Sequence, residues 1–191
     1  MPKTAEPLLS PRVLALAAMI LLVALSRLLP HPPNFAPVES MALFAGALFL
    51  DRRLAFLVPL AAMAISDVGL ELVMGAGYGF HSLLPLVYAC IAGTVLLGVL
   101  LRGRIGVASV AIASVVSALG FFAVTNFAVW WGSGMYPQTV EGLVACYVAA
   151  LPFLKNGVAG ALAYSLILFG GHALLQRRWP ALAIPAGAPA R

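Results

Sequence analysis

Long apolar runs separated by short polar stretches organise this chain. The runs predict helices at residues 13–29, 38–50, 54–74, 81–101, 105–129 and 140–175. Only helices and closed barrels satisfy their backbone in hydrocarbon, and the strands of a barrel alternate apolar and polar residues. Because these runs are continuous, the pattern predicts an all-α polytopic membrane protein. The predicted organisation is one six-helix transmembrane domain over 13–176, between tails at 1–12 and 177–191.

The composition is that of a protein whose solvent is lipid. Of the 191 residues, 63% are hydrophobic and 9% are charged, whereas a soluble domain carries about 25% charged residues. The formal net charge is +5, but the basic residues are spread over short turns and form no nucleic-acid footprint. We therefore predict a lipid bilayer as the surroundings and no nucleic acid as a partner.

The basic turns predict the orientation of the chain. With six helices, four basic pairs fall on one side: Lys3/Arg12, Arg52/Arg53, Arg102/Arg104 and Arg177/Arg178. The positive-inside rule makes that side cytoplasmic, so both termini are predicted inside and the location is a bacterial inner membrane. The longer loops at 30–37, 75–79 and 131–138 would then face outward, and any binding site would open on that face.

Two helices depart from the usual length of a span. The 38–50 helix is shorter than the roughly 20 residues of a full crossing, and it follows a loop with four prolines at 30–37. We expect this proline-rich loop to dip inward and pack against protein; the alternative is five spans with a re-entrant 38–50 helix. The 140–175 helix is longer than one span, so a bend is expected at Gly157, Gly160 or the Gly170–Gly171 pair.

The stretch 121–156 has the character of one wall of a binding site. Asn126 ends an apolar run, Trp130 and Tyr136 flank a Gly-rich turn, and a second apolar run follows. The aromatic side chains are either an interfacial belt or a surface on which a flat ligand stacks.

Asp67 and Glu71 are four residues apart and therefore share one face of a helix. Carboxylates inside a membrane are costly and normally face a protein interior or a water-filled cavity. They could bind a substrate or cation, relay protons, or form ion pairs with Arg27 and Lys155. Lys155 itself is expected in an ion pair at the floor of a pocket.

Candidate metal ligands are few. His31 and His81 lie at outer helix boundaries, as ligands or as interfacial polar residues, and Cys90 and Cys146 lie within apolar runs. Each cysteine is either a small buried hydrophobe or a thiol ligand for a soft metal. No HExxH or CxxC spacing occurs, so no protein-only metal site is predicted. A catalytic triad order and nucleotide-binding motifs are also missing from the sequence.

Three segments resemble a known family: SRLLPHPPNFAPVESMALFAGA at 26–47, ISD at 65–67, and TNFAVW followed by MYPQTVEGLVACYVAALPF at 125–153. They are similar to small bacterial membrane proteins related to the substrate-binding S-components of energy-coupling-factor (ECF) vitamin transporters. Within that group, the chain most resembles the solitary BtuM-type cobalamin transporters. The resemblance covers residues 26–171.

This resemblance implies an S-component-like bundle that binds a vitamin, here cobalamin as substrate, near its outer face. It also implies a cysteine thiolate that ligates cobalt and can displace cyanide; by position this is Cys90, with His81 as the alternative. The pocket would be shaped by ligand-binding residues His31, Asn34, Asp67, His81, Tyr88, Asn126, Trp130 and Tyr136.

The alanines of the first helix lack the AxxxA spacing with which S-components dock on a shared ATPase module, which predicts a protein without an ECF ATPase partner. Three alternatives remain open. The chain could be an S-component for another small metabolite, a membrane-embedded enzyme with Asp67 and Glu71 as acid and base, or a structural protein without a ligand.

Overall fold

The computed structural model describes residues 7–184, which form helices and no strands. The main helices are α1 Pro11–Leu25, α2 Val38–Leu48, α3 Arg52–Met74, α4 Leu84–Leu100, α5 Val107–Gly132 and α6 Val140–Ser165. A 3₁₀ turn, η1 (Ser26–Leu28), extends α1, while a π turn, η2 (Leu166–Gly170), joins α6 to α7 (Gly171–Arg178) ahead of a last turn, η3 (Pro180–Leu182). The all-α prediction is confirmed. Lys3 and residues 185–191 of the predicted C-terminal tail lie outside the described residues.

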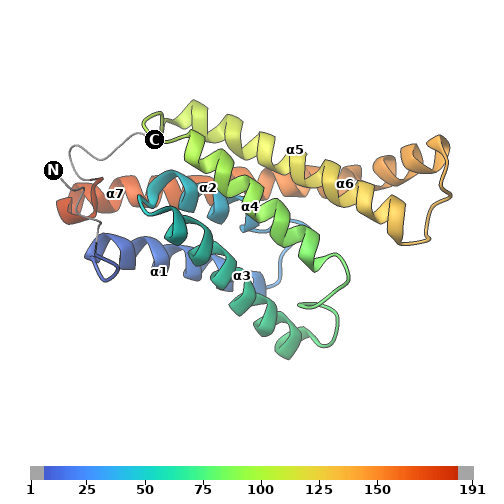
Figure 1. Ribbon diagram of the computed structural model, residues 1–191, viewed down its shortest axis with the longest axis horizontal. Coiled ribbons are helices and arrows are strands. Elements are labelled where there is room, and N and C mark those ends of the chain that lie inside the picture. The colour runs from blue at the N-terminus through green and yellow to red at the C-terminus, as the bar shows by residue number, and fades with distance from the viewer. Residues whose placement is uncertain (1–6, 185–191) are drawn as a thin grey trace.

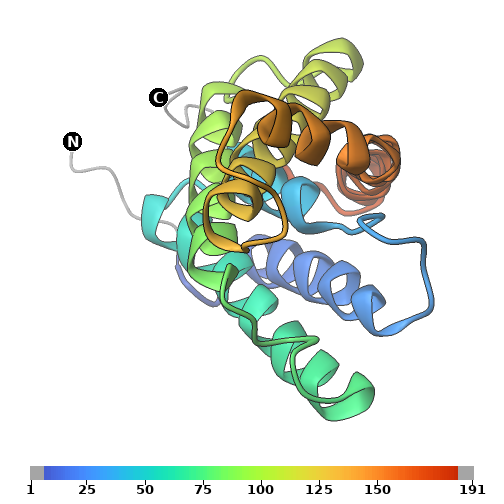
Figure 2. The same ribbon diagram turned by 90° about the vertical axis from the view of Figure 1, so that its right-hand side faces the viewer.

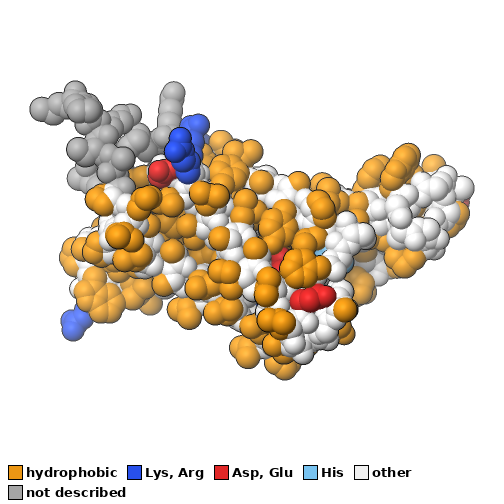
Figure 3. Space-filling model, turned by 60° about the horizontal axis from the view of Figure 1, so that its bottom comes forward, with side chains coloured by type: hydrophobic (Ala, Val, Ile, Leu, Met, Phe, Trp, Pro, Cys, Tyr) orange, Lys and Arg blue, Asp and Glu red, His pale blue; other side chains and the backbone are white. Residues whose placement is uncertain are grey.

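Four helical segments are long and apolar enough to cross a membrane: Pro11–Leu28, Arg52–Met74, Val107–Gly132 and Val140–Arg178. They lie roughly along one direction, with the proline-rich loop (residues 30–37), the α3–α4 loop and the α5–α6 turn at one end (Figures 1 and 2). Hydrophobic side chains cover most of the face in Figure 3, and its Lys and Arg side chains lie at the other end. These features are those of a membrane protein.

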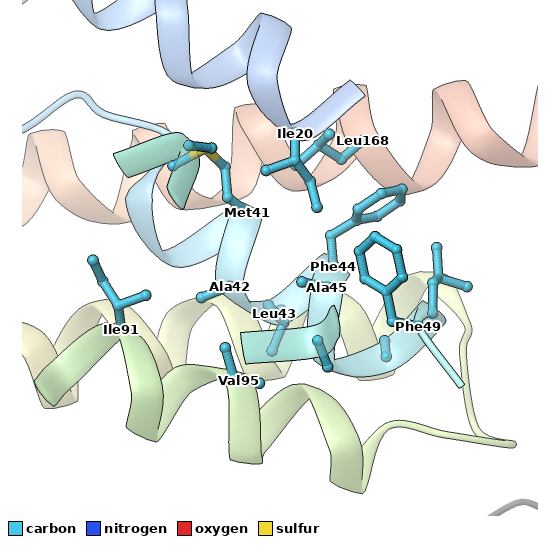
Figure 4. Packing of buried hydrophobic residues seen from close by; sticks show 14 of the residues in the cluster. Ile20, Met41, Ala42, Leu43, Phe44, Ala45, Phe49, Ile91, Val95 and Leu168 are labelled. Atoms are coloured by element: carbon cyan, nitrogen blue, oxygen red, sulfur yellow. The ribbon is translucent and has the colours of Figure 1, made fainter. Parts of the chain in front are cut away.

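The short helix α2 lies at the centre of the bundle. All eleven of its residues are buried, and it packs against α1, α3, α4, α5 and α6. Figure 4 shows Phe44 of α2 directed toward Leu168 and α1, and Leu43 directed toward Val95 of α4. A helix that is apolar on all sides is stable only inside protein or lipid, and here protein surrounds it.

The entry to α2 follows the proline-rich loop. His31 and Asn34 are exposed, whereas Pro37 is buried, so the loop descends into the bundle. Asn156 Nδ2 of α6 donates a hydrogen bond to the Pro33 carbonyl at 3.0 Å. The Phe35 ring lies 5.8 Å from the Tyr164 ring, centroid to centroid. The predicted packing of this loop against protein is confirmed for residues 35–37, whereas residues 30–34 are exposed.

Two glycines allow α2 and α4 to approach closely. A Cβ on Gly46 would lie 2.1 Å from the carbonyl oxygen of Val95, and one on Gly98 would lie 2.3 Å from that of Leu43. Small residues at helix contacts permit such backbone approach in membrane proteins. The position of α2 beside α4 therefore depends on both glycines.

Two buried arginines close the C-terminal end of α2. Arg12 Nη2 donates to the Leu48 carbonyl, and Arg102 donates from Nε to the Gly46 carbonyl (2.9 Å) and from Nη2 to the Phe49 carbonyl (2.5 Å). The last carbonyls of a helix have no partner within it, and cations there also interact favourably with the helix dipole. The sequence had indicated these arginines only as topology signals, but they also hold the end of α2.

The long C-terminal helix contains a π turn at one of the three positions where the sequence predicts a bend. The π turn η2 ends at Gly170, next to Gly171, and the helical segment is otherwise continuous over 39 residues. The α5–α6 hairpin, residues 107–165, extends well beyond the α3–α4 loop at the same end (Figure 1).

Candidate functional site

A cavity of about 530 Å³ lies at the end of the bundle opposite the basic turns. It is bounded by η1, the proline-rich loop, the start of α2, and by α3, α5 and α6. Its lining residues include Arg27, His31, Asn34, Val38, Glu39, Met63, Leu70, Tyr78, His81, Val87, Ala118, Phe121, Phe122, Thr125, Asn126, Phe153 and Leu154. We call this space the central cavity.

Arg27 contributes a positive charge to the cavity wall, and that charge is neutralised in place. Its Nη1 lies 2.7 Å from Asp67 Oδ1 and donates to Ser66 Oγ at 2.5 Å. The other carboxylate oxygen of Asp67 accepts from the Tyr88 hydroxyl at 2.9 Å. Asp67 is 1% exposed and Arg27 12%. Two of the predicted site residues, Asp67 and Tyr88, therefore do not line the cavity. Asp67 fixes Arg27, and Tyr88 in turn fixes Asp67. The predicted pairing of Asp67 with Arg27 is confirmed.

Glu71 has a different task from Asp67. Its carboxylate accepts backbone N–H bonds from Gly77 (3.0 Å), Gly79 (3.0 Å) and Phe80 (3.2 Å). These bonds fix the α3–α4 loop, which places Tyr78 and His81 on the cavity. The two carboxylates that share a helix face in the sequence therefore serve separate structures: Asp67 pairs with Arg27, and Glu71 holds the α3–α4 loop.

Glu39 is the carboxylate that lines the cavity itself. It lies in the first turn of α2, is 8% exposed, and receives a hydrogen bond from its own backbone amide. Among residues 7–184, no other side chain forms an ion pair or hydrogen bond with it. The sequence analysis assigned no role to Glu39. An acidic residue opening a short, otherwise apolar helix was the signal that could have found it.

Four predicted binding residues come together on the central cavity: His31, Asn34, His81 and Asn126. The Nδ1 of His31 is 2.6 Å from the Leu29 carbonyl, and Asn126 Nδ2 donates to the Phe122 carbonyl at 2.8 Å. The predicted wall at 121–156 is present in two parts, near Phe121 to Asn126 and near Phe153 to Leu154.

The aromatic turn of that stretch lies elsewhere. Trp130 and Tyr136 are outside the cavity lining, at the tip of the α5–α6 hairpin. The indole of Trp130 donates to the Pro137 carbonyl at 3.0 Å, and its ring lies 5.9 Å from that of Trp131, which is exposed. This arrangement is that of an aromatic cluster closing a turn, as in an interfacial belt.

Cys90 lies outside the central cavity. It is half-buried in a separate apolar hollow of about 400 Å³ between α4 and α5, which shares Phe121 with the cavity. Cys146 is buried, and its thiol lies 3.5 Å from the Asn126 carbonyl. The described residues contain no group of three His, Cys, Asp or Glu arranged to hold a metal ion. Cobalt ligation by Cys90 stays a prediction.

The expectation for Lys155 is wrong. Its side chain is exposed, and Asp67 pairs with Arg27. The next residue, Asn156, is bonded to the exposed proline-rich loop. Its neighbours Phe153, Leu154 and Gly157 line the central cavity, so Lys155 lies on another, exposed face of α6.

The model of one protein family, described as a family of unknown function (DUF6580), matches residues 8–182. The chain therefore belongs to DUF6580. Comparisons with curated proteins and with solved structures give no match. The family description names no activity, and nothing in these comparisons links the chain to S-components, so that resemblance stays a prediction.

Proposed function

We propose that this member of DUF6580 is a membrane-embedded uptake protein that captures a small metabolite in its central cavity. The cavity is the observation that supports this proposal most directly. Its volume of about 530 Å³ lies within the roughly 300–1,000 Å³ of pockets for small ligands. Its walls combine apolar and aromatic side chains with a few polar groups, which is the usual make-up of such pockets.

In this proposal the cavity faces the outside of a bacterial inner membrane. The exposed Arg52, Arg53 and Arg104 lie at the opposite end of the bundle, together with Arg177 and Arg178, and basic residues favour the cytoplasmic side. Helices α2 and α4 complete six passages through the bundle, with α2 shielded from lipid by its neighbours. A solitary protein without an ATPase module remains part of the proposal.

Hydrogen bonds that fix the loops around the cavity favour binding of a ligand. The proline-rich loop is tied to α6 through Asn156, and the α3–α4 loop is tied to α3 through Glu71. Rigid walls reduce the loss of conformational freedom on binding. The polar groups that reach the cavity, among them Arg27 and Asn126, would orient the ligand.

Cobalamin is a second candidate because two imidazoles, those of His31 and His81, line the cavity, and imidazole is a suitable ligand for transition metals. A corrinoid is larger than the molecules that a cavity of this volume encloses. It would therefore lie across the outer loops, with one axial face directed to an imidazole. For this reason a smaller metabolite is our first proposal.

Native mass spectrometry of the protein, purified from cells in mild detergent, tests the proposal. We expect the wild-type protein to retain a small molecule. Thr125→Trp, which places a large ring in the cavity, should lose it. Val116→Trp on the same helix is the control, because Val116 is exposed and lines none of the hollows described. A wild-type protein that retains no small molecule, or a Thr125→Trp variant that still retains one, would contradict the proposal.

A further inference from the structure

The central cavity contains a carboxyl group, that of Glu39, which forms no ion pair with another residue of the described chain. The charged residues in its lining are Arg27 and Glu39. Arg27 is already in contact with Asp67 at 2.7 Å, so this pair is close to neutral. Glu39, at the start of α2 and 8% exposed, has no oppositely charged partner among the described residues.

Polar groups next to Glu39 along the chain do not relieve this imbalance. The hydroxyl of Ser40 donates to the Ala161 carbonyl at 2.8 Å and is therefore occupied. The amide of Glu39 itself and the positive end of the α2 dipole stabilise a carboxylate at this position. Both are partial charges, and an ionised carboxylate taken out of water normally needs a full counter-charge or a proton.

Aromatic rings surround the same space. Tyr78, Phe121, Phe122 and Phe153 all line the cavity. The faces of such rings attract cations and stack on flat molecules. A carboxylate on one wall and aromatic rings on the others are suited to an organic cation with a flat body.

We propose that Glu39 is a binding residue for a cationic group, and that the ligand of the central cavity is a small organic cation. The carboxylate of Glu39 pairs with a protonated amine or a charged heteroaromatic ring, and the aromatic walls hold the rest of the molecule. This inference rests on the proposed function, because it names the chemical class of the captured metabolite.

The test is a thermal-shift titration of the purified protein with probes matched in size. The cationic probes are benzyltrimethylammonium, 2-phenylethylamine and 1-methylpyridinium; 2-phenylethanol and benzyl alcohol are neutral, and phenylacetate is anionic. In the wild-type protein, we expect at least one cation to bind about tenfold more tightly than any neutral or anionic probe, as a desolvated charge pair predicts.

Glu39→Gln keeps the shape of the side chain and removes its charge. We expect this variant to lose the preference for the cations, while Glu39→Asp keeps part of it. Glu141→Gln is the matched control, since Glu141 is exposed in the first turn of α6 and lies outside the cavity lining. This control should bind as the wild-type protein does.

Each result has a defined meaning. A wild-type preference for neutral or anionic probes, no binding of any cationic probe, or an unchanged cation preference in Glu39→Gln would overturn the inference. The wild-type comparison needs no variant, so a poorly folded Glu39→Gln protein would not block the test. A small molecule retained in native mass spectrometry that proves uncharged would remove this inference and leave the proposed function standing.

Discussion

The two ends of α2 differ in whether their polar groups have side-chain partners. At the C-terminal end, Arg12 and Arg102 donate hydrogen bonds to the last carbonyls, and the polar backbone is closed off by charged side chains. At the N-terminal end, Glu39 faces a cavity and has no partner side chain among the described residues. One buried helix thus has a C-terminal end whose carbonyls are capped by arginines, and an N-terminal end whose carboxyl group has no partner side chain among the described residues. The proposed ligand site is at this N-terminal end.

The largest loss of stability is expected at the C-terminal end of α2, which Arg12 and Arg102 cap. Arg102→Met would leave the carbonyls of Gly46 and Phe49 buried without donors, and each such loss is costly. We expect the free energy of unfolding to fall by about 4 kcal/mol. Denaturant titration in detergent measures this. Arg104→Met in the same turn is the control, since Arg104 is exposed; equal losses in the two variants would show that Arg102 is no cap.

Asp67→Asn changes the charge balance in the central cavity, at the N-terminal end of α2. Arg27 would lose its counter-charge while 12% exposed, so we expect a loss of stability of about 3 kcal/mol. The freed guanidinium would then offset Glu39 within the cavity, so the preference for cationic probes should weaken as well. Probe titration beside the unfolding curve checks both parts. A variant with reduced stability but an undiminished cation preference would show that the two charges do not share the cavity.

A smaller effect is expected where α2 meets α4. Gly98→Ala would place a Cβ 2.3 Å from the Leu43 carbonyl, and overpacking of this kind costs about 2 kcal/mol. Gly93→Ala, on the same helix, is the control because a Cβ there meets nothing within 4 Å. Chemical unfolding of both variants measures the difference. If Gly98→Ala is as stable as Gly93→Ala, the close approach of the two helices does not constrain the position of α2.

Hydropathy alone was enough to predict the helices, because the apolar runs begin and end at charges, prolines or glycine-rich turns. The same pattern could not predict the caps of α2. It shows that a basic residue follows an apolar run, but not that Arg102 reaches a carbonyl 56 residues away in the chain. Glu39 was missed for a related reason: its burial results from the helices around α2, which a linear pattern does not contain.

The candidate site was predicted best where its residues come from outer loops. His31, Asn34 and His81 adjoin predicted helix ends on one face of the membrane, and they do line one cavity. Trp130 and Tyr136 belong to the tip of the α5–α6 hairpin, whose outward projection carries them away from it (Figure 1). Lys155 lies at the level of the cavity but on an exposed face of α6. Depth along a helix depends on where the helix begins relative to its neighbours, and the sequence does not supply this.

The smallest expected change in stability is at Cys90. This thiol is half-buried in the hollow between α4 and α5, so Cys90→Ala should alter the free energy of unfolding by less than about 1 kcal/mol. The informative measurement is the absorbance spectrum of protein purified from cells grown with cyanocobalamin. A retained corrinoid whose shifted spectrum reverts in Cys90→Ala would establish thiolate ligation. It would also mean that the ligand reaches the α4–α5 hollow and not only the end of α2 that carries Glu39.

A shifted spectrum that persists in Cys90→Ala but is lost in His81→Ala would place the metal at the central cavity. A colourless protein would exclude cobalamin as the ligand, and the proposed ligand at the N-terminal end of α2 would then be a smaller cation.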